Sequence, residues 1–281
     1  MVRVGLTSYA FTWEIGLAGY PQPPHPLDPA SLIKEAHALN AKVLQICDNI
    51  DLTTLDTTEL ARLKDLAYKN EITIQVGFRG CELITVEKYL DIAEQLEARL
   101  IRMLIDLKTP GVTSESVVET LKKVVPRLER LGSVIAIENY DRCSSIDILR
   151  ILAQLQSSSI GVCLDPANSL GVPENPYEVV SLLGPFSLCL HLKDVTIKRF
   201  PHQQGFLIEG CPLGEGQLDI IHILDTLFKK NSKLDIPVLL ELWVPYKQSI
   251  EETIATEKQW RNSGLATLYQ MLKTLKIEIQ I

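Results

Sequence analysis

The sequence predicts a single (β/α)8 (TIM) barrel with an eight-stranded parallel sheet. Short runs of Val, Ile and Leu recur along the 281 residues, and each is apolar on both faces. Parallel strands that are covered on both sides have this composition. Longer amphipathic segments separate the runs, and strict alternation of this kind indicates βαβ crossovers. Because no linker divides the alternation, we expect one barrel domain over residues 1–281.

The expected strands are about five residues long and rich in branched aliphatic side chains. They are residues 2–9, 43–47, 72–76, 100–105, 134–137, 160–164, 188–192 and 238–242. The expected helices have apolar residues at helical spacing. They are residues 28–40, 56–70, 85–98, 114–131, 145–156, 176–183, 217–229 and 249–275.

The remaining segments give weaker signals. Asp28-Pro29 supplies an N-cap and a first helical residue for the first helix. Residues 49–51 and 200–211 are expected to be surface loops. Residues 276–281 have the polarity pattern of a strand, and the pattern does not place them in the barrel.

Composition excludes several classes of protein. The formal charge of −7 disfavours a nucleic-acid platform, since the phosphate backbone attracts clustered Lys and Arg. No apolar stretch approaches the ~20 residues that span a bilayer. The N-terminal run is too short and too polar for a signal peptide. We therefore expect a cytoplasmic protein without a membrane partner.

The cysteines fit the same compartment. None forms a C-x-x-C pair, so the spacing required of a thiolate metal site is absent. We expect buried free thiols in a reducing cytosol. The six are Cys47, Cys81, Cys143, Cys163, Cys189 and Cys211.

Four consecutive strands deliver a potential metal ligand as they end, and the reactive face of such a barrel lies at this rim. Three packed carboxylates would repel one another and resist ionisation, and a divalent cation removes that conflict. Three oxygens and one imidazole suit Mn²⁺, Mg²⁺, Co²⁺, Fe²⁺ or Zn²⁺. One such residue alone would be an ordinary cap or ion-pair partner, whereas four at this spacing predict a metal site. They are Glu138, Asp165, His191 and Glu241.

At these residues the sequence resembles the xylose isomerase-like TIM barrel superfamily, in its sugar phosphate isomerase/epimerase branch. The likeness extends over essentially the whole chain, and the order and spacing of its pieces are more specific than any one piece. The pieces are Ile137-Glu138-Asn139, Leu164-Asp165-Pro166-Ala167-Asn168, His191-Leu192-Lys193-Asp194, the segment 212–219 and Leu240-Glu241.

The resemblance implies a role for each of these residues. The four rim residues would be the metal ligands, and Glu138 and Glu241 would also form the catalytic acid/base pair. Lys193 and Asp194 would be a neighbouring charged pair, and Asn168 a substrate contact. Ketohexose 3-epimerases tend to have His where Asn168 stands, so the resemblance counts against a ketohexose substrate.

The expected activity is that of a divalent-metal-dependent isomerase or epimerase acting on a sugar, polyol or hydroxy-carbonyl compound. A metal-stabilised enediolate would follow removal of a proton next to the carbonyl by a glutamate. The same residues would serve a metal-dependent dehydratase (lyase) of an inosose- or shikimate-like ring. The ligands alone do not separate these reactions.

Two other classes are disfavoured. The apurinic endonucleases of the superfamily need extra histidines for a trinuclear zinc site, and the strands ending at Asp48 and Asp106 supply none. A non-catalytic binding protein would have no reason to retain four mutually repelling ligands. We expect a small sugar-like substrate and no nucleic-acid partner, and the question of a homo-oligomer stays open.

Other residues near the rim have weaker signals. Trp13 and Trp243 follow the first and last strands and are candidates for stacking on a sugar. Lys193 lies two residues after His191 and therefore points to the same side. It would bind a substrate oxygen or pair with a neighbouring carboxylate. Arg79 and Arg102 are less favoured candidates for binding an anion.

Overall fold

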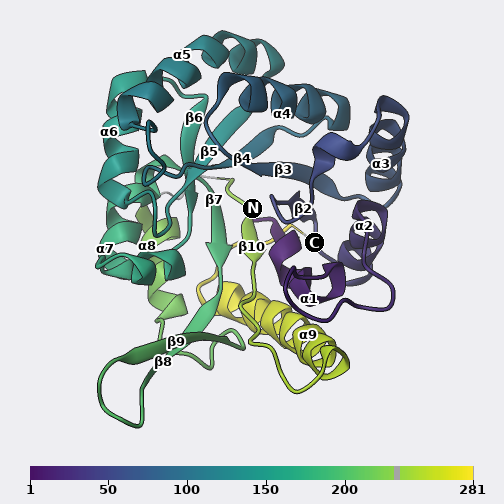
Figure 1. Ribbon diagram of the computed structural model, residues 1–281, viewed down its shortest axis with the longest axis vertical. Helices are drawn as coiled ribbons and strands as arrows, with labels where there is room; N and C mark the ends of the chain where they lie inside the picture. The colour runs from purple at the N-terminus through teal and green to yellow at the C-terminus, as the bar shows by residue number, and fades with distance from the viewer. Residues whose placement is uncertain (231–234, 281) are drawn as a thin grey trace.

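A computed structural model describes residues 1–230 and 235–280 and confirms the (β/α)8 barrel. Eight parallel strands close in the order β1-β10-β7-β6-β5-β4-β3-β2 (Figure 1). Their apolar side chains are buried inside the barrel and under the helices. The strands are β1 Val4–Thr7, β2 Val43–Ile46, β3 Thr73–Arg79, β4 Leu100–Leu104, β5 Val134–Glu138, β6 Ile160–Leu164, β7 Ser187–Leu192 and β10 Val238–Leu240.

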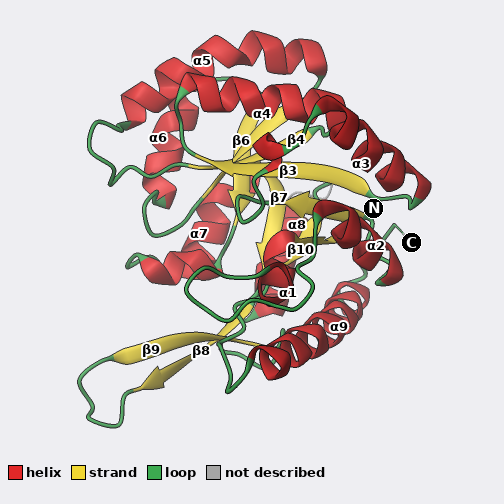
Figure 2. Cartoon of the chain, turned by 45° about the vertical axis from the view of Figure 1, so that its right-hand side comes forward, coloured by secondary structure: helices red, strands yellow, loops and turns green. Residues whose placement is uncertain are grey.

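The helices surround the sheet, as Figure 2 shows. Seven of them follow the barrel strands in sequence: α2 Pro29–Ala38, α3 Thr57–Lys69, α4 Leu83–Leu96, α5 Ser114–Leu131, α6 Ser145–Leu155, α7 Pro176–Leu183 and α8 Ile220–Lys230. Two further helices, α1 (Thr12–Ile15) and α9 (Ile250–Thr274), pack against each other, and α9 also packs against β10. All eight helices expected from the sequence are present.

Local signals determine where several helices begin. The Asp28 carboxylate accepts a hydrogen bond from Ser31 N at 2.7 Å, with Pro29 as the first helical residue. Asp56 and Glu59 form a reciprocal capping box at the start of α3. These caps satisfy backbone N–H groups that have no partner within the helix.

The expected loop over residues 200–211 is wrong in its second half. Residues Phe206–Cys211 form strand β9, which pairs antiparallel with β8 (Asp194–Arg199). This hairpin extends away from the barrel (Figures 1 and 2). Its outer residues are exposed, so the inside-outside alternation that marks a half-buried strand is missing from the sequence there.

The end of the chain also has a place. Val2 and Ile279 form an isolated parallel bridge, in which Gln280 N donates to Val2 O at 2.9 Å. The strand-like pattern of residues 276–280 therefore corresponds to one bridge beside the first strand. The last residue of that expected segment, 281, lies outside the described residues.

Helix α9 holds the loop after β1 against the barrel mouth. The buried Glu257 carboxylate accepts hydrogen bonds from the backbone N–H groups of Trp13 (3.0 Å) and Glu14 (3.2 Å). Arg261 pairs with Glu14 at 2.7 Å, and its guanidinium lies 4.0 Å from the centre of the Phe11 ring. These contacts fix one side of the rim.

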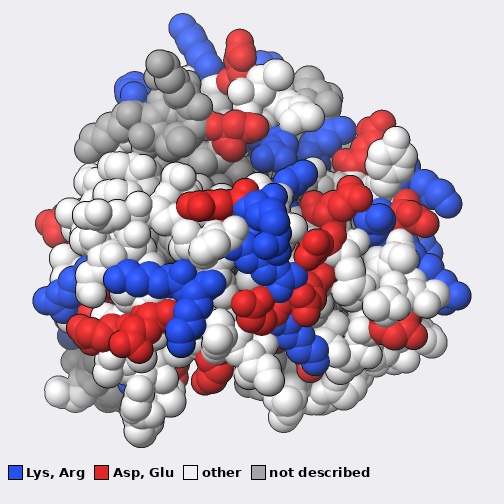
Figure 3. Space-filling model, turned by 90° about the horizontal axis from the view of Figure 1, so that it is seen from above, with Lys and Arg blue, Asp and Glu red and all other residues white. Residues whose placement is uncertain are grey.

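The surface has no dominant charge on the side seen in Figure 3, where Lys and Arg side chains lie among Asp and Glu. Among residues 1–230 and 235–280, no helix combines the length and the apolar character that crossing a bilayer requires.

Candidate active site

The candidate site is a cavity of about 340 Å³ at the C-terminal ends of the barrel strands. Its wall combines acids, arginines and aromatic side chains that come from loops and strand ends all around the rim. They are Tyr9, Arg79, Arg102, Leu104, Glu138, Tyr140, Asp141, Asn168, Gly171, Glu241 and Trp243.

A buried imidazole lies at the centre of the acidic side chains. His191 Nδ1 is 3.2 Å from a Glu241 oxygen, 3.7 Å from a Glu138 oxygen and 4.0 Å from an Asp165 oxygen. None of these oxygens is aligned for a hydrogen bond with Nδ1, so this nitrogen has no hydrogen-bond partner among the described residues. Ligand atoms of Glu138, Asp165 and His191 lie within 4.8 Å of one another. A buried nitrogen that is surrounded by carboxylates but not bonded to them fits a site for a cation.

The other ring nitrogen shows which tautomer the site favours. His191 Nε2 lies 2.8 Å from the amide oxygen of Gln45, on β2. That oxygen also accepts from the Cys47 thiol at 3.4 Å, while the Gln45 amide nitrogen donates to Gln75 at 2.9 Å. The Nε2 atom therefore donates the hydrogen, so neutral His191 has its lone pair on Nδ1. Metal-binding histidines are commonly oriented by a hydrogen bond of this kind.

Two side chains of the protein already offset part of the acidic charge. Arg102 donates from Nε to Glu138 and from Nη1 to Asp48, and Lys193 pairs with Asp165 and, at 2.7 Å, with Glu241. The sequence predicted relief of the repulsion by a metal ion and left open a pairing of Lys193 with a neighbouring carboxylate. The structure shows that pairing and adds the one made by Arg102, which was not expected. The partners of Arg102 and Lys193 lie far apart in the sequence and meet only when the barrel closes.

Two asparagines position the acids. The Asn139 side chain exchanges two hydrogen bonds with the backbone of Asp165, at 2.9 and 2.7 Å. Asn168 donates from its side chain to Glu138 at 2.9 Å and from its backbone to Asp165 at 3.1 Å. The carboxylates are therefore held in place before any ligand binds.

The paired charges shift the ionisation of the acids. Burial opposes ionisation of Glu138, but Arg102 and protonated His191, whose own pKa is raised well above its usual value, outweigh it and lower the pKa of Glu138 to about 2. Burial likewise opposes ionisation of Glu241, and Lys193 with His191 lowers its pKa well below the usual range. For Asp165 burial prevails over Lys193 and raises the pKa to about 6. Both glutamates are thus carboxylates at neutral pH.

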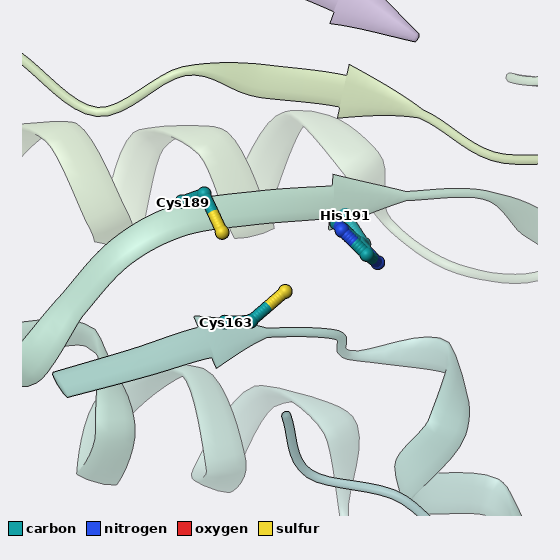
Figure 4. A group of neighbouring side chains, drawn as sticks. All are labelled: Cys163, Cys189 and His191. Atoms are coloured by element: carbon teal, nitrogen blue, oxygen red, sulfur yellow. The ribbon is translucent and has the colours of Figure 1, made fainter. Parts of the chain in front are cut away.

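A second group of possible ligands lies deeper in the barrel. Cys163 on β6 and Cys189 on β7 point their sulfur atoms toward each other, and His191 lies farther along β7 (Figure 4). Burial raises the pKa of the Cys163 thiol well above its ordinary value. This thiol stays protonated and is a poor metal ligand near pH 7. All six cysteines are buried and free, as expected.

The other predicted site residues lie at different depths. Asn168 and Trp243 line the cavity. Lys193 is buried behind it, 4.6 Å below the centre of the Trp243 ring, and pairs with Asp165 and Glu241 rather than with Asp194. Asp194 instead accepts hydrogen bonds from backbone N–H groups of the 214–218 loop.

Trp13 faces a different hollow. Its ring packs with Tyr20 and Tyr246, and its Nε1 donates to Val244 O at 2.8 Å. It lines a neighbouring cavity of about 410 Å³ that shares Tyr9 and Trp243 with the first.

Sequence reasoning did not select Gln45, Asp48 or Tyr140. Gln45 and Asp48 lie at the end of β2, and Tyr140 lies two residues after Glu138. The rule that strand ends supply the reactive face would have included them. They were not selected because an amide, a phenol and a single acid do not form a set of residues with the spacing of metal ligands.

Residues 33–264 match the family model of the xylose isomerase-like TIM barrel. The chain belongs to this family. The resemblance inferred from the sequence is therefore confirmed.

The known proteins that resemble this chain include enzymes with different names. The 3-oxo-isoapionate decarboxylase of Pectobacterium atrosepticum is 31% identical over 268 residues, which cover 95% of each chain. The structure of an L-ribulose 3-epimerase has a TM-score of 0.72 at 12% identity and covers 98% of this chain and 96% of its own. A xylose isomerase-like protein from Mycobacterium smegmatis, solved in complex with magnesium, has a TM-score of 0.66 at 13% identity and covers 95% and 98%. The two structures show the shared fold.

Two arginines that share Asp48 allow a matched test of the electrostatics. Arg102 is 3% exposed, and its loss would leave Glu138 and Asp48 without a counter-charge. We expect Arg102→Met to lower the free energy of unfolding by about 3–5 kcal/mol. Arg79, which is 49% exposed, is the control, and we expect Arg79→Met to cost less than about 1 kcal/mol. Urea unfolding measures both, and equal losses would contradict the assignment.

Proposed function

We propose that the protein is a decarboxylase of a 3-oxo sugar acid that works with a divalent cation. Two observations support the proposal: the likeness to 3-oxo-isoapionate decarboxylase over 95% of both chains, and the unpartnered His191 Nδ1 beside Glu138 and Glu241, which line the cavity. The second carries it, since a charged centre beside a substrate-sized cavity is what the chemistry needs.

The residues that would hold the cation are Glu138, Asp165, His191 and Glu241. They present oxygen atoms and one neutral imidazole nitrogen, a donor set that suits a first-row divalent ion or Mg²⁺. When bound, such an ion supplies Lewis acidity that lowers the energy of negative charge on a carbonyl oxygen. Gln45 orients the imidazole, and Asn139 and Asn168 orient the acids.

The reaction balances without a redox partner. The bond between the carboxylate carbon and its neighbour breaks, and its electron pair moves toward the 3-oxo group to form an enolate. Carbon dioxide leaves, and the enolate carbon takes up one proton. Glu138 and Glu241 both line the cavity, so either can relay this proton. Asn168 and Trp243 would contact the substrate, and the predicted contacts of Lys193 and Trp13 stay predictions.

Isomerisation or epimerisation is the second candidate, and one observation favours it. Glu138 and Glu241 line the same cavity from β5 and from the residue after β10, and β6 and β7 separate these strands in the barrel. Ionised carboxylates on two sides of a substrate can remove and return a proton. This route passes through the same enediolate that the sequence analysis expected, and a dehydratase would use it as well.

The products distinguish the three reactions. We expect 3-oxo-isoapionate or a related 3-oxo sugar acid to release one carbon dioxide per turnover and to leave a ketose. In deuterated water one deuteron should enter at the carbon that had held the carboxylate. Interconversion of two sugars without gas release would support the epimerase or isomerase instead, and an absorbing enone would support the dehydratase.

Substitution of the two glutamates tests their roles. Glu138→Gln and Glu241→Gln keep the shape but remove the charge, and we expect each to lower kcat roughly 10²- to 10⁴-fold. Glu178→Gln, on the exposed side of α7, is the control and should leave kcat unchanged. Near-wild-type rates in both site variants would exclude them from the chemistry.

Direct metal binding tests the cation site without using activity. We expect Mn²⁺ titrated into chelator-treated protein to bind at one site per chain, as followed by electron paramagnetic resonance. Gln45→Leu removes the acceptor for His191 Nε2 and should weaken binding roughly 10- to 100-fold. Gln75→Leu, which leaves the Gln45–His191 bond, should have a smaller effect. Undiminished Mn²⁺ affinity in His191→Ala would rule out this site.

A further inference from the structure

We propose that Arg79 and Tyr140 form the subsite that binds the carboxylate of the substrate, so that the site selects acids over neutral sugars. This inference rests on the proposed function, because it assigns residues to the group that the reaction removes. It names the side chains that determine substrate class, and four observations lead to it.

The first observation is that Arg79 is held in place with donors to spare. It is the last residue of β3, it lines the cavity, and its Nε donates to Asp48 at 3.2 Å. Its Nη1 and Nη2 atoms form no hydrogen bond with the described residues. Arg102, in contrast, is almost fully buried and bonds Glu138 and Asp48. Arg79 is therefore the guanidinium that remains available to a ligand.

The second observation is an unsatisfied hydroxyl beside it. The Tyr140 side chain also lines the cavity and is 8% exposed, and its hydroxyl has no hydrogen-bond partner among the described residues. The Arg79 guanidinium carbon lies 5.6 Å from the centre of the Tyr140 ring. A buried hydroxyl without a partner is costly, and a ligand oxygen would satisfy it.

The third observation concerns charge. Within the rim, four carboxylates (Asp48, Glu138, Asp165 and Glu241) lie among three side-chain cations (Arg79, Arg102 and Lys193). The remaining acid of the wall, Asp141, lies 4.0 Å from Arg142. With a neutral His191 and a divalent cation in place, one positive charge would be left uncompensated. A substrate with a single negative charge balances it.

The fourth observation is a row of alternating charges between the two ends of the site. Arg79 contacts Asp48, Asp48 contacts Arg102, and Arg102 contacts Glu138. The row begins at the Arg79 guanidinium, which keeps its Nη1 and Nη2 donors for a ligand, and ends in the acidic group around His191.

The chemistry also explains why an exposed arginine suits this role. A guanidinium binds a carboxylate through two parallel N–H···O bonds. A fully buried pair would stabilise the substrate strongly and resist loss of carbon dioxide, whereas the half-exposed Arg79 binds it moderately. Once carbon dioxide has left, the product has no charge for Arg79, so its affinity falls and it is released.

Binding of two unreactive probes tests the subsite. Threonate and threitol have the same chain length, and only threonate has a carboxylate. In calorimetric titrations of the Mn²⁺-loaded protein we expect threonate to bind at least about tenfold more tightly than threitol. Arg79→Met should remove this difference without changing threitol binding, and Arg79→Lys should restore part of it. Tyr140→Phe should weaken threonate binding roughly 2- to 10-fold.

Controls separate this inference from the proposed function. Arg142→Met, a neighbouring half-exposed arginine outside the cavity, should leave both affinities unchanged. If Arg79→Met lowers the affinity for threonate but no 3-oxo acid is decarboxylated, the subsite stands and the proposed reaction fails. The carboxylate subsite is refuted if Arg79→Met binds threonate as tightly as the wild type does. It is also refuted if inorganic phosphate displaces threonate equally well from the wild type and from Arg79→Met.

Discussion

A buried imidazole nitrogen, surrounded by three carboxylates and bonded to none of them, is the constraint on which the rest of the site depends. Gln45 accepts the hydrogen of His191 Nε2, so Nδ1 is the nitrogen that faces the acids. Lone pairs and carboxylates that face one another are tolerated only if positive charge lies between or beside them. The surrounding residues either supply that positive charge or hold the acids in position.

The protein supplies part of the charge itself. Arg102 and Lys193 each contact two acids, so every carboxylate around His191 has one cationic neighbour. This arrangement lets the barrel fold with its acids ionised and leaves the imidazole nitrogen for a ligand. Because Arg102 and Lys193 already offset part of the acidic charge, a bound divalent cation would make the cavity more attractive to anions.

The sequence was sufficient to predict the architecture and the rim. The strands are mostly apolar on both faces, as expected of a sheet covered by helices, and the four proposed ligands do lie at the strand ends. The pairs made by Arg102 were not predictable, because Arg102 meets Asp48 and Glu138 only through barrel closure, whereas a carboxylate partner for Lys193 was one of the two alternatives that the sequence left open. The β8–β9 hairpin was missed for a different reason, since both its faces are largely open to solvent and it has no clear alternation. Gln45 was missed because an amide that only orients a histidine is neither a metal ligand nor an acid or base.

Anomalous diffraction from crystals soaked in Mn²⁺ tests the central claim most directly. The account predicts one strong peak at roughly 2.0–2.2 Å from His191 Nδ1, with oxygen atoms of Glu138, Asp165 and Glu241 around it. A peak elsewhere, or an empty position at saturating Mn²⁺ with the acids paired only to Arg102 and Lys193, would contradict it.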